Sequence, residues 1–125
     1  MNWNEKPSRR EIDKKISGAK KALSENRAYF APTDAKLIGE LMDLEIGDTE
    51  ELWPLILELL EEIEIDDYAG SRPPQRSYEP NIAKCELFAF SWKSKKLQKE
   101  MYLQFALQDG DFHYVSLHES KKKEF

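Results

Sequence analysis

Cysteine, histidine and long apolar runs are scarce in this chain of 125 residues, and each scarcity excludes a class of protein. The single cysteine, Cys85, cannot form an internal disulfide, which is typical of a reducing compartment, so we expect a cytoplasmic protein. Two histidines and one cysteine without paired ligand spacing predict no metal site, and we expect no cofactor. No apolar run approaches the roughly 20 residues that span a membrane, and the polar N-terminus lacks the apolar core of a secretory signal.

Negative charge dominates the whole chain, with a formal net charge of −5, but it is unevenly distributed. Residues 48–67 contain nine acidic side chains and no basic one, whereas residues 68–125 contain ten bases and seven acids. The C-terminal part therefore carries a small positive excess, which is compatible with a polyanionic ligand. A surface that is merely solvated by its charges is an equally good interpretation.

Three amphipathic segments predict helices in the first half of the chain. Ser8 and Glu11 form a capping box before apolar residues at helical spacing, which predicts a helix over residues 9–25. The segment "RAYFAPT" is typical of a brief strand. Thr33 can cap a second helix, with Leu37, Ile38, Leu41 and Leu44 as its apolar face, that ends near Gly47. A third helix is predicted from about Thr49, with an apolar stripe at Leu52, Ile56, Leu59, Leu60 and Ile63 and acids facing solvent.

The second half of the chain reads as β-structure after a loop over residues 66–80, which is rich in proline and glycine. "CELFAFSW" predicts a first strand, "KSKKLQK" a basic connection, and residues 101–120 two further strands. The fold class is therefore α+β, with N-terminal helices packed on a C-terminal antiparallel sheet. We expect one domain over residues 1–125, with a flexible N-terminus over 1–7 and a basic tail over 121–125.

The register of the last two strands depends on the turn at Asp109-Gly110. A two-residue turn is the first choice for this dipeptide, but it would place Val115 and Leu117 opposite the face of Leu103. A three-residue loop, Gln108-Asp109-Gly110, keeps the apolar residues together. We therefore predict the odd loop, which pairs Leu103 with Val115, Met101 with Leu117, Phe105 with His113, and Tyr102 with Ser116.

In this register one sheet face carries four polar side chains, Tyr102, Gln104, Ser116 and His118, with His118 diagonal to Tyr102. His113 lies on the apolar face and is expected to be a packed histidine. The polar set is either an active surface or simply the solvated side of an antiparallel sheet. Histidine can accept and donate a proton near neutral pH, and tyrosine can donate a hydrogen bond or stack on a base.

The order of these segments resembles the MqsR family of type II toxin-antitoxin toxins, which have the RelE-like fold. The resemblance runs over residues 14–120. It rests on the basic first helix, "ENRAYFAPTDAKLIGELMDL", "IDDYAG", "ELFAFSW", "MYLQFAL" and "YVSLHES". It implies a ribosome-independent, metal-free endoribonuclease that cleaves mRNA, arrests growth and is neutralised by a cognate antitoxin, expected to be a helix-turn-helix protein.

Two positions carry the implied catalysis. Tyr102 matches the tyrosine of the family's "VYLK"-like strand, and His118 falls where the closing strand carries a functional lysine or histidine. Gln104 stands where the family has a lysine. The family's catalytic glutamine has no clear counterpart in "ELFAFSW", and its lysine before that strand is missing.

Substrate contacts are predicted from the polar face and from the basic segments. Gln104 and Ser116 belong to the first group, and the phosphate-binding group consists of Lys95, Lys96 and Lys99 with Arg72 and Arg76, to which Lys93 can contribute. The missing family residues and the negative net charge favour an alternative, a non-catalytic protein-interaction domain of the same fold.

Overall fold

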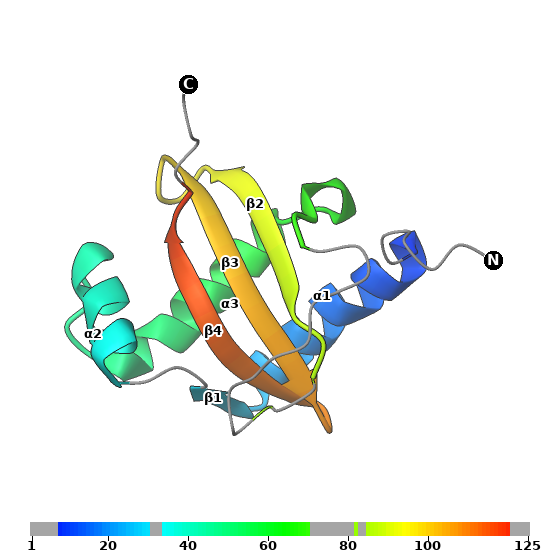
Figure 1. Cartoon of the computed structure of the whole chain (residues 1–125), viewed down its shortest axis with the longest axis horizontal. Helices are drawn as coiled ribbons and strands as arrows, with labels where there is room; N and C mark the ends of the chain where they lie inside the picture. The colour runs from blue at the N-terminus through cyan, green and yellow to red at the C-terminus, as the bar shows by residue number, and fades with distance from the viewer. Residues whose placement is uncertain (1–7, 31–33, 71–81, 83–84, 121–125) are drawn as a thin grey trace.

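The computed structural model describes residues 8–30, 34–70, 82 and 85–120. The elements are α1 (Arg9–Ser24), β1 (Ala28–Phe30), α2 (Asp34–Asp43), a 3₁₀ turn (Thr49–Glu51), α3 (Leu52–Glu62), a second 3₁₀ turn (Ile65–Asp67), β2 (Phe88–Ser94), β3 (Lys99–Gln108) and β4 (Asp111–Glu119). The predicted α+β class is confirmed. Figure 1 shows α1 and α3 crossing behind the sheet and α2 beside β4. The predicted termini, the Thr33 cap, Arg72 and Arg76 lie outside the described residues.

The helices form largely where the sequence predicts them. The Ser8 hydroxyl accepts a hydrogen bond from the Glu11 amide and starts α1. Asn26, in the left-handed region at φ 60°, ends it, and the Arg27 amide donates to the Ala22 carbonyl in a Schellman arrangement. The predicted stripe of α3 is buried throughout: Leu52, Ile56, Leu59, Leu60 and Ile63.

The second helix differs from its prediction in two respects. It ends at Asp43 rather than near Gly47, because Glu45 adopts φ 59° and the Ile46 amide donates to the Leu41 carbonyl. Glu45 thus closes a Schellman motif at a position usually occupied by glycine. A prediction of helix ends that relies on glycine therefore misses it. Ile38, expected on the apolar face, is 55% exposed, because only a narrow side of α2 reaches β4.

The sheet contains four strands in the order β1-β4-β3-β2. Strands β2, β3 and β4 form the predicted antiparallel meander, while β1 adds to β4 in parallel, so the sheet is mixed. The face towards α1 and α3, which we call the helix face, holds Met101, Leu103 and Phe105, all fully buried. The opposite side is called the outer face.

The odd loop predicted for the last hairpin is wrong. Asp109 and Gly110 form a two-residue turn with φ values of 53° and 83°, and Gln108 pairs directly with Asp111. A β-bulge then shifts the register: Phe105 pairs with Tyr114, but Gln104 pairs with Ser116, which leaves Val115 as the extra residue. The bulge in β4, rather than an extra residue in the loop, thus places apolar residues of β3 and β4 on the same face of the sheet.

The bulge also corrects the predicted pairs and faces. Leu103 pairs with Leu117 and Met101 with Glu119, whereas Val115 lies in a small outer-face cluster with Ile82, Leu87 and Ala106. His113, predicted opposite Phe105 on the apolar side, pairs with Ala106 on the outer face. Tyr114 takes the helix-face position and is fully buried.

Candidate functional site

Tyr102 and His118 are direct cross-strand neighbours on the outer face. The predicted partner of Tyr102 was Ser116, with His118 diagonal to it, but the bulge moves His118 into register with Tyr102. Their rings are stacked, with centroids 5.0 Å apart and an interplanar angle of 24°. Ser91 of β2 pairs with Tyr102 from the other side, so the three residues form one row across the sheet. This row brings the two predicted catalytic residues together more closely than the sequence suggested.

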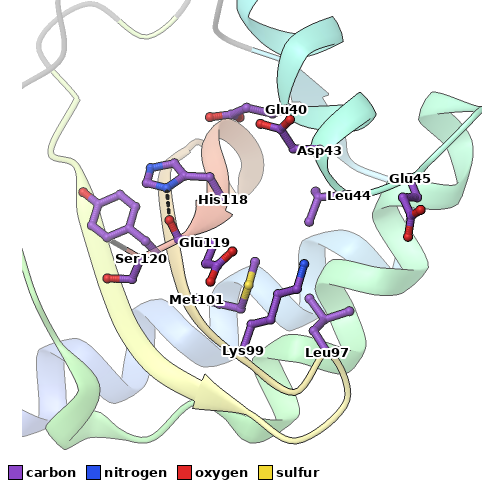
Figure 2. A pocket seen from close by; sticks show the side chains of 11 residues that line it. Glu40, Asp43, Leu44, Glu45, Leu97, Lys99, Met101, His118, Glu119 and Ser120 are labelled. Carbon is purple, nitrogen blue, oxygen red and sulfur yellow. Dashed lines mark hydrogen bonds between the residues drawn. The ribbon is translucent and has the colours of Figure 1, made fainter. Parts of the chain in front are cut away.

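The backbone beside His118 fixes the orientation of its imidazole. Nδ1 lies 2.9 Å from the carbonyl oxygen of Glu119, as the dashed line in Figure 2 shows. A carbonyl oxygen only accepts, so this contact places the proton of the neutral ring on Nδ1 and the lone pair on Nε2. His118 is therefore held in the tautomer that a general base acting through Nε2 requires.

Tyr102 has the complementary property. Burial of the phenol raises the pKa of Tyr102 above its ordinary value. Its hydroxyl accordingly stays protonated around neutral pH and acts as a hydrogen-bond donor. The pair thus combines one proton acceptor and one proton donor on the same row of the sheet.

The pair opens onto a hollow of about 910 Å³ at the end of β4. Figure 2 shows that its walls come from α2, from the start of β3 and from the end of β4. The lining residues are Glu40, Asp43, Leu44, Glu45, Leu97, Lys99, Met101, Tyr102, His118, Glu119 and Ser120. Four of these are acidic and one is a lysine, so the rim is predominantly negative.

Glu62 of α3 holds the basic connection between β2 and β3 in place. Its carboxylate accepts hydrogen bonds from Trp92 Nε1 (3.0 Å), the Ser94 hydroxyl (2.7 Å) and the amides of Lys95 and Lys96 (3.0 and 2.9 Å). Burial alone would raise the pKa of Glu62, but these hydrogen bonds outweigh it and lower the pKa. The prediction that the acids of this helix only face solvent missed this role, because it depends on a partner 30 residues away.

The predicted phosphate-binding lysines are not gathered at one place. Lys96 Nζ forms an ion pair with Glu58 at 2.9 Å, on the helix side of the molecule. Lys99 lines the hollow. Lys93 is exposed and alternates with buried Trp92 and Ser94, so it lies on the outer face. Lys99 therefore lines the same hollow as Tyr102 and His118, and Lys93 lies on the outer face two residues from Ser91, the partner of Tyr102.

The other two predicted contacts differ in accessibility. Gln104 is partly exposed on β3, two residues from Tyr102 on the same face. Ser116 is only 4% exposed, and its hydroxyl donates to Glu40 at 2.5 Å, so it is not on the exposed surface that the sequence predicted. We leave Ser116 out of the site.

No pattern in the sequence indicated a role for Glu40. Its carboxylate accepts from the Tyr114 and Ser116 hydroxyls and from the Leu117 amide (3.2 Å). Glu40 thereby accepts hydrogen bonds along the part of the β4 edge that lies beyond the end of β1. The hydrogen bond to Glu40 adds to burial in raising the pKa of Tyr114 far above its ordinary value, so this phenol remains a donor.

Comparison of the chain with protein-family models, with curated proteins and with solved structures found no significant match in any of the three. Within the part of the chain that the structure describes, no helix is long and apolar enough to cross a membrane. The same residues contain no group of three or more histidine, cysteine or acidic side chains placed to hold a metal ion. The assignment of function therefore rests on the geometry of the site.

Proposed function

We propose that this protein is an endoribonuclease that cleaves mRNA with its own side chains, as the toxin of a type II toxin-antitoxin system with a RelE-like, MqsR-type fold. The observation that carries the proposal is the stacked pair of Tyr102 and His118, with the imidazole oriented by the Glu119 carbonyl. A solvated sheet face has no need for an oriented imidazole beside a protonated phenol. Two groups of this kind are what cleavage of an RNA phosphodiester requires.

The chemistry follows from the two side chains. His118 Nε2 removes the proton of a ribose 2′-hydroxyl, whose oxygen attacks the adjacent phosphorus. The bond from phosphorus to the 5′-oxygen breaks, and the Tyr102 hydroxyl gives its proton to that leaving oxygen. The proton taken up by His118 then returns to the Tyr102 phenolate through solvent, which resets both side chains. The products are a 2′,3′-cyclic phosphate and a 5′-hydroxyl end. Lys99, which lines the same hollow, and Lys93, which lies on the outer face, offset the charge that develops on the phosphate.

A second candidate function is favoured by the acidic rim of the hollow. Asp43, Glu45 and Glu119 would repel a phosphate backbone but attract a basic polypeptide. On this alternative the chain is a protein-interaction domain, and the paired rings serve as an aromatic contact rather than as catalysts. The two candidate functions differ in whether the protein cleaves RNA.

The experiment uses purified protein and a radiolabelled mRNA. The parent protein is expected to produce 5′-hydroxyl ends, and His118→Ala is expected to lower the rate by roughly 10²–10⁴-fold, the usual contribution of general acid-base catalysis. Tyr102→Phe keeps the ring and removes the hydroxyl, so it separates proton donation from stacking. Both variants should melt at nearly the parent temperature, because partly exposed polar groups contribute little to stability. Absence of cleavage by the parent, or full activity of both variants, would exclude the nuclease.

The proposal includes a partner. A nuclease of this kind arrests the growth of its host unless a cognate antitoxin, expected to be a small helix-turn-helix protein, neutralises it. Expression of the chain alone should therefore arrest growth, and co-expression with the product of the neighbouring gene should restore it. Unchanged growth on expression of soluble parent protein would contradict the toxin role and favour the interaction domain.

A further inference from the structure

The side of α2 that points away from the sheet carries apolar side chains where a surface helix normally carries polar ones. Met42 is 71% exposed and Ile38 is 55% exposed, and being four positions apart they are neighbours on the helix surface. Gly39 and Asp43 lie one position further on, and both are exposed. We call Ile38, Gly39, Met42 and Asp43 the exposed side of α2.

Gly39 leaves the backbone of the exposed side of α2 bare. A Cβ at Gly39 would meet nothing within 4 Å, whereas a Cβ at Gly18 of α1 would come within 3.0 Å of the Leu107 side chain. Packing within the described residues therefore requires no glycine at position 39, although glycine inside a helix costs about 1 kcal/mol relative to alanine. Bare backbone beside two apolar side chains is a surface that another backbone can approach closely.

The exposed side of α2 ends in negative charge that the described residues do not compensate. Asp43 lies in the last turn of α2, which contains no basic residue, and Glu45 follows it. The carboxylates of Asp43 and Glu45 take part in none of the ion pairs among the described residues. Because the C-terminal end of a helix is itself partially negative, both charges favour a cation from outside the chain.

Asp43 connects the exposed side of α2 with the hollow at Tyr102 and His118. It lines that hollow together with Glu45, and Figure 2 shows both residues on the α2 wall. A ligand that packs on the exposed side of α2 and contacts Asp43 therefore also reaches the mouth of the hollow.

We infer that the exposed side of α2 docks a basic amphipathic helix of another protein. The apolar stripe of that helix packs on Ile38 and Met42 across Gly39, and its lysines or arginines pair with Asp43 and Glu45. This combination of apolar contact and opposite charge is what the exposed side of α2 and its negative end offer. The inference does not depend on the proposed nuclease function.

Three other occupants match this surface less well. A second copy of the chain has the same net charge of −5 and would bring its own Asp43 towards the first. RNA is repelled by the same carboxylates. Residues 121–125 of this chain are basic but contain a single apolar residue, so they match the carboxylates without covering both Ile38 and Met42.

Docking on α2 also has a consequence for RNA cleavage, and this consequence does rest on the proposed nuclease function. A helix with its side chains is roughly 10–12 Å wide. One that packs on α2 with its cations at Asp43 therefore covers the mouth of the hollow and keeps RNA from Tyr102 and His118. The docked helix would thus inhibit cleavage without touching either ring.

Binding is measured by fluorescence anisotropy with three labelled synthetic peptides of about 18 residues, long enough to form a helix. The first has leucines at helical spacing and lysines elsewhere. The second replaces its leucines by serine, and the third replaces its lysines by glutamate. The first peptide should bind to the parent protein, and the other two should bind at least about tenfold more weakly, because each lacks one of the two contributions. Absence of binding by the first peptide, or equal binding by either of the others, would overturn the docking surface.

Gly39→Lys places the binding on the exposed side of α2. Lysine forms helices better than glycine, so this variant should melt at or above the parent temperature. It fills the bare backbone with a positive charge, so the first peptide should bind at least about tenfold more weakly than to the parent. Ser24→Lys makes the same change of charge at an exposed position of α1 and should bind as the parent does in about 0.15 M salt. Equal binding by Gly39→Lys and the parent would overturn the assignment.

Two further measurements identify the other occupants. Light scattering that shows a dimer of the parent, lost in Gly39→Lys, would assign the surface to a second copy and overturn the inference. Peptide binding that appears only after removal of residues 121–125 would assign it to the chain's own basic segment, with the same result. A monomer that binds the first peptide equally with and without these residues supports the inference.

The cleavage assay tests the consequence separately. Saturating first peptide should inhibit cleavage of the labelled mRNA by the parent and leave cleavage by Gly39→Lys uninhibited. Equal inhibition of the two proteins would mean that the peptide acts on the RNA, and peptide binding without inhibition would mean that the hollow stays open. Either result overturns the masking of the hollow. Absence of cleavage by the parent overturns the proposed nuclease and leaves the docking surface to be judged by anisotropy.

Discussion

His113 and His118 lie on the same face of β4, although five positions separate them. Side chains alternate along a strand, so an odd separation normally places two residues on opposite faces. Val115 is the extra residue of the bulge between them, and it brings the second histidine back to the face of the first. The position of both histidines therefore depends on one backbone irregularity, which also keeps Tyr114 and Leu117 in the core.

Phe105 is expected to be a major contributor to stability. It is fully buried and stacks on Phe90 and Phe112, with ring centroids 5.9 and 5.3 Å apart. Phe105→Ala should lower the free energy of unfolding by roughly 3–5 kcal/mol in denaturant melts. Met42→Ala is the control, because Met42 is 71% exposed and should change stability by no more than about 0.5 kcal/mol. A loss below about 1 kcal/mol for Phe105→Ala would show that the Phe105 side chain is not buried in the core.

Glu62 should make stability depend on pH in the acid range. Its pKa is lowered in the folded protein, so its contribution is present above the unfolded glutamate pKa and is lost as pH falls through the folded one. Glu62→Gln should cost about 1–3 kcal/mol at pH 7. One carboxylate oxygen is replaced by an NH2 group, which faces two of the four donors without accepting from them, and the remaining oxygen is a neutral acceptor. The difference between parent and variant should shrink below the ordinary glutamate range. Glu61→Gln, on the exposed side of α3, serves as the control, and a pH-independent difference would contradict the assignment.

Glu40 is expected to hold α2 against the edge of β4. All three of its partners are donors, so Glu40→Gln, whose amide nitrogen is itself a donor, should lose about 1–3 kcal/mol of stability. Ser116→Ala removes one donor and leaves the other two in place, and its effect should be smaller. Chemical denaturation of the two single variants and the double variant measures their coupling. Strict additivity would mean that Ser116 and Glu40 do not interact in solution.

The lysines of the β2–β3 connection should contribute unequally to RNA binding. Lys99 lines the hollow, whereas Lys96 is held in an ion pair with Glu58 of α3. Lys99→Gln should reduce the slope of log K against log salt concentration by about 0.7, the value for one phosphate contact on a single strand. Lys96→Gln and Lys21→Gln should leave the slope unchanged. An unchanged slope in the triple variant of Lys95, Lys96 and Lys99 would show that this segment contacts no phosphate.

Local sequence patterns were sufficient to predict the class of fold and most of its elements. The capping box at Ser8, the apolar stripe of α3 and the alternation along β3 are local signals, because each follows from the geometry of a single helix or strand. The same alternation put Tyr102 and Gln104 on the face opposite the core. These predictions needed no knowledge of what each element contacts.

The pairing of the site residues depends on contacts between elements that are distant in the sequence. The sequence contains the dipeptide of the tight turn, but the bulge at Val115 arises because β4 must bury Tyr114 and Leu117 against the helices while keeping that turn. Glu40 and Glu62 likewise gain their roles from partners at least 30 residues away. Such choices depend on packing between elements, and packing is a property of the whole fold that no local pattern encodes.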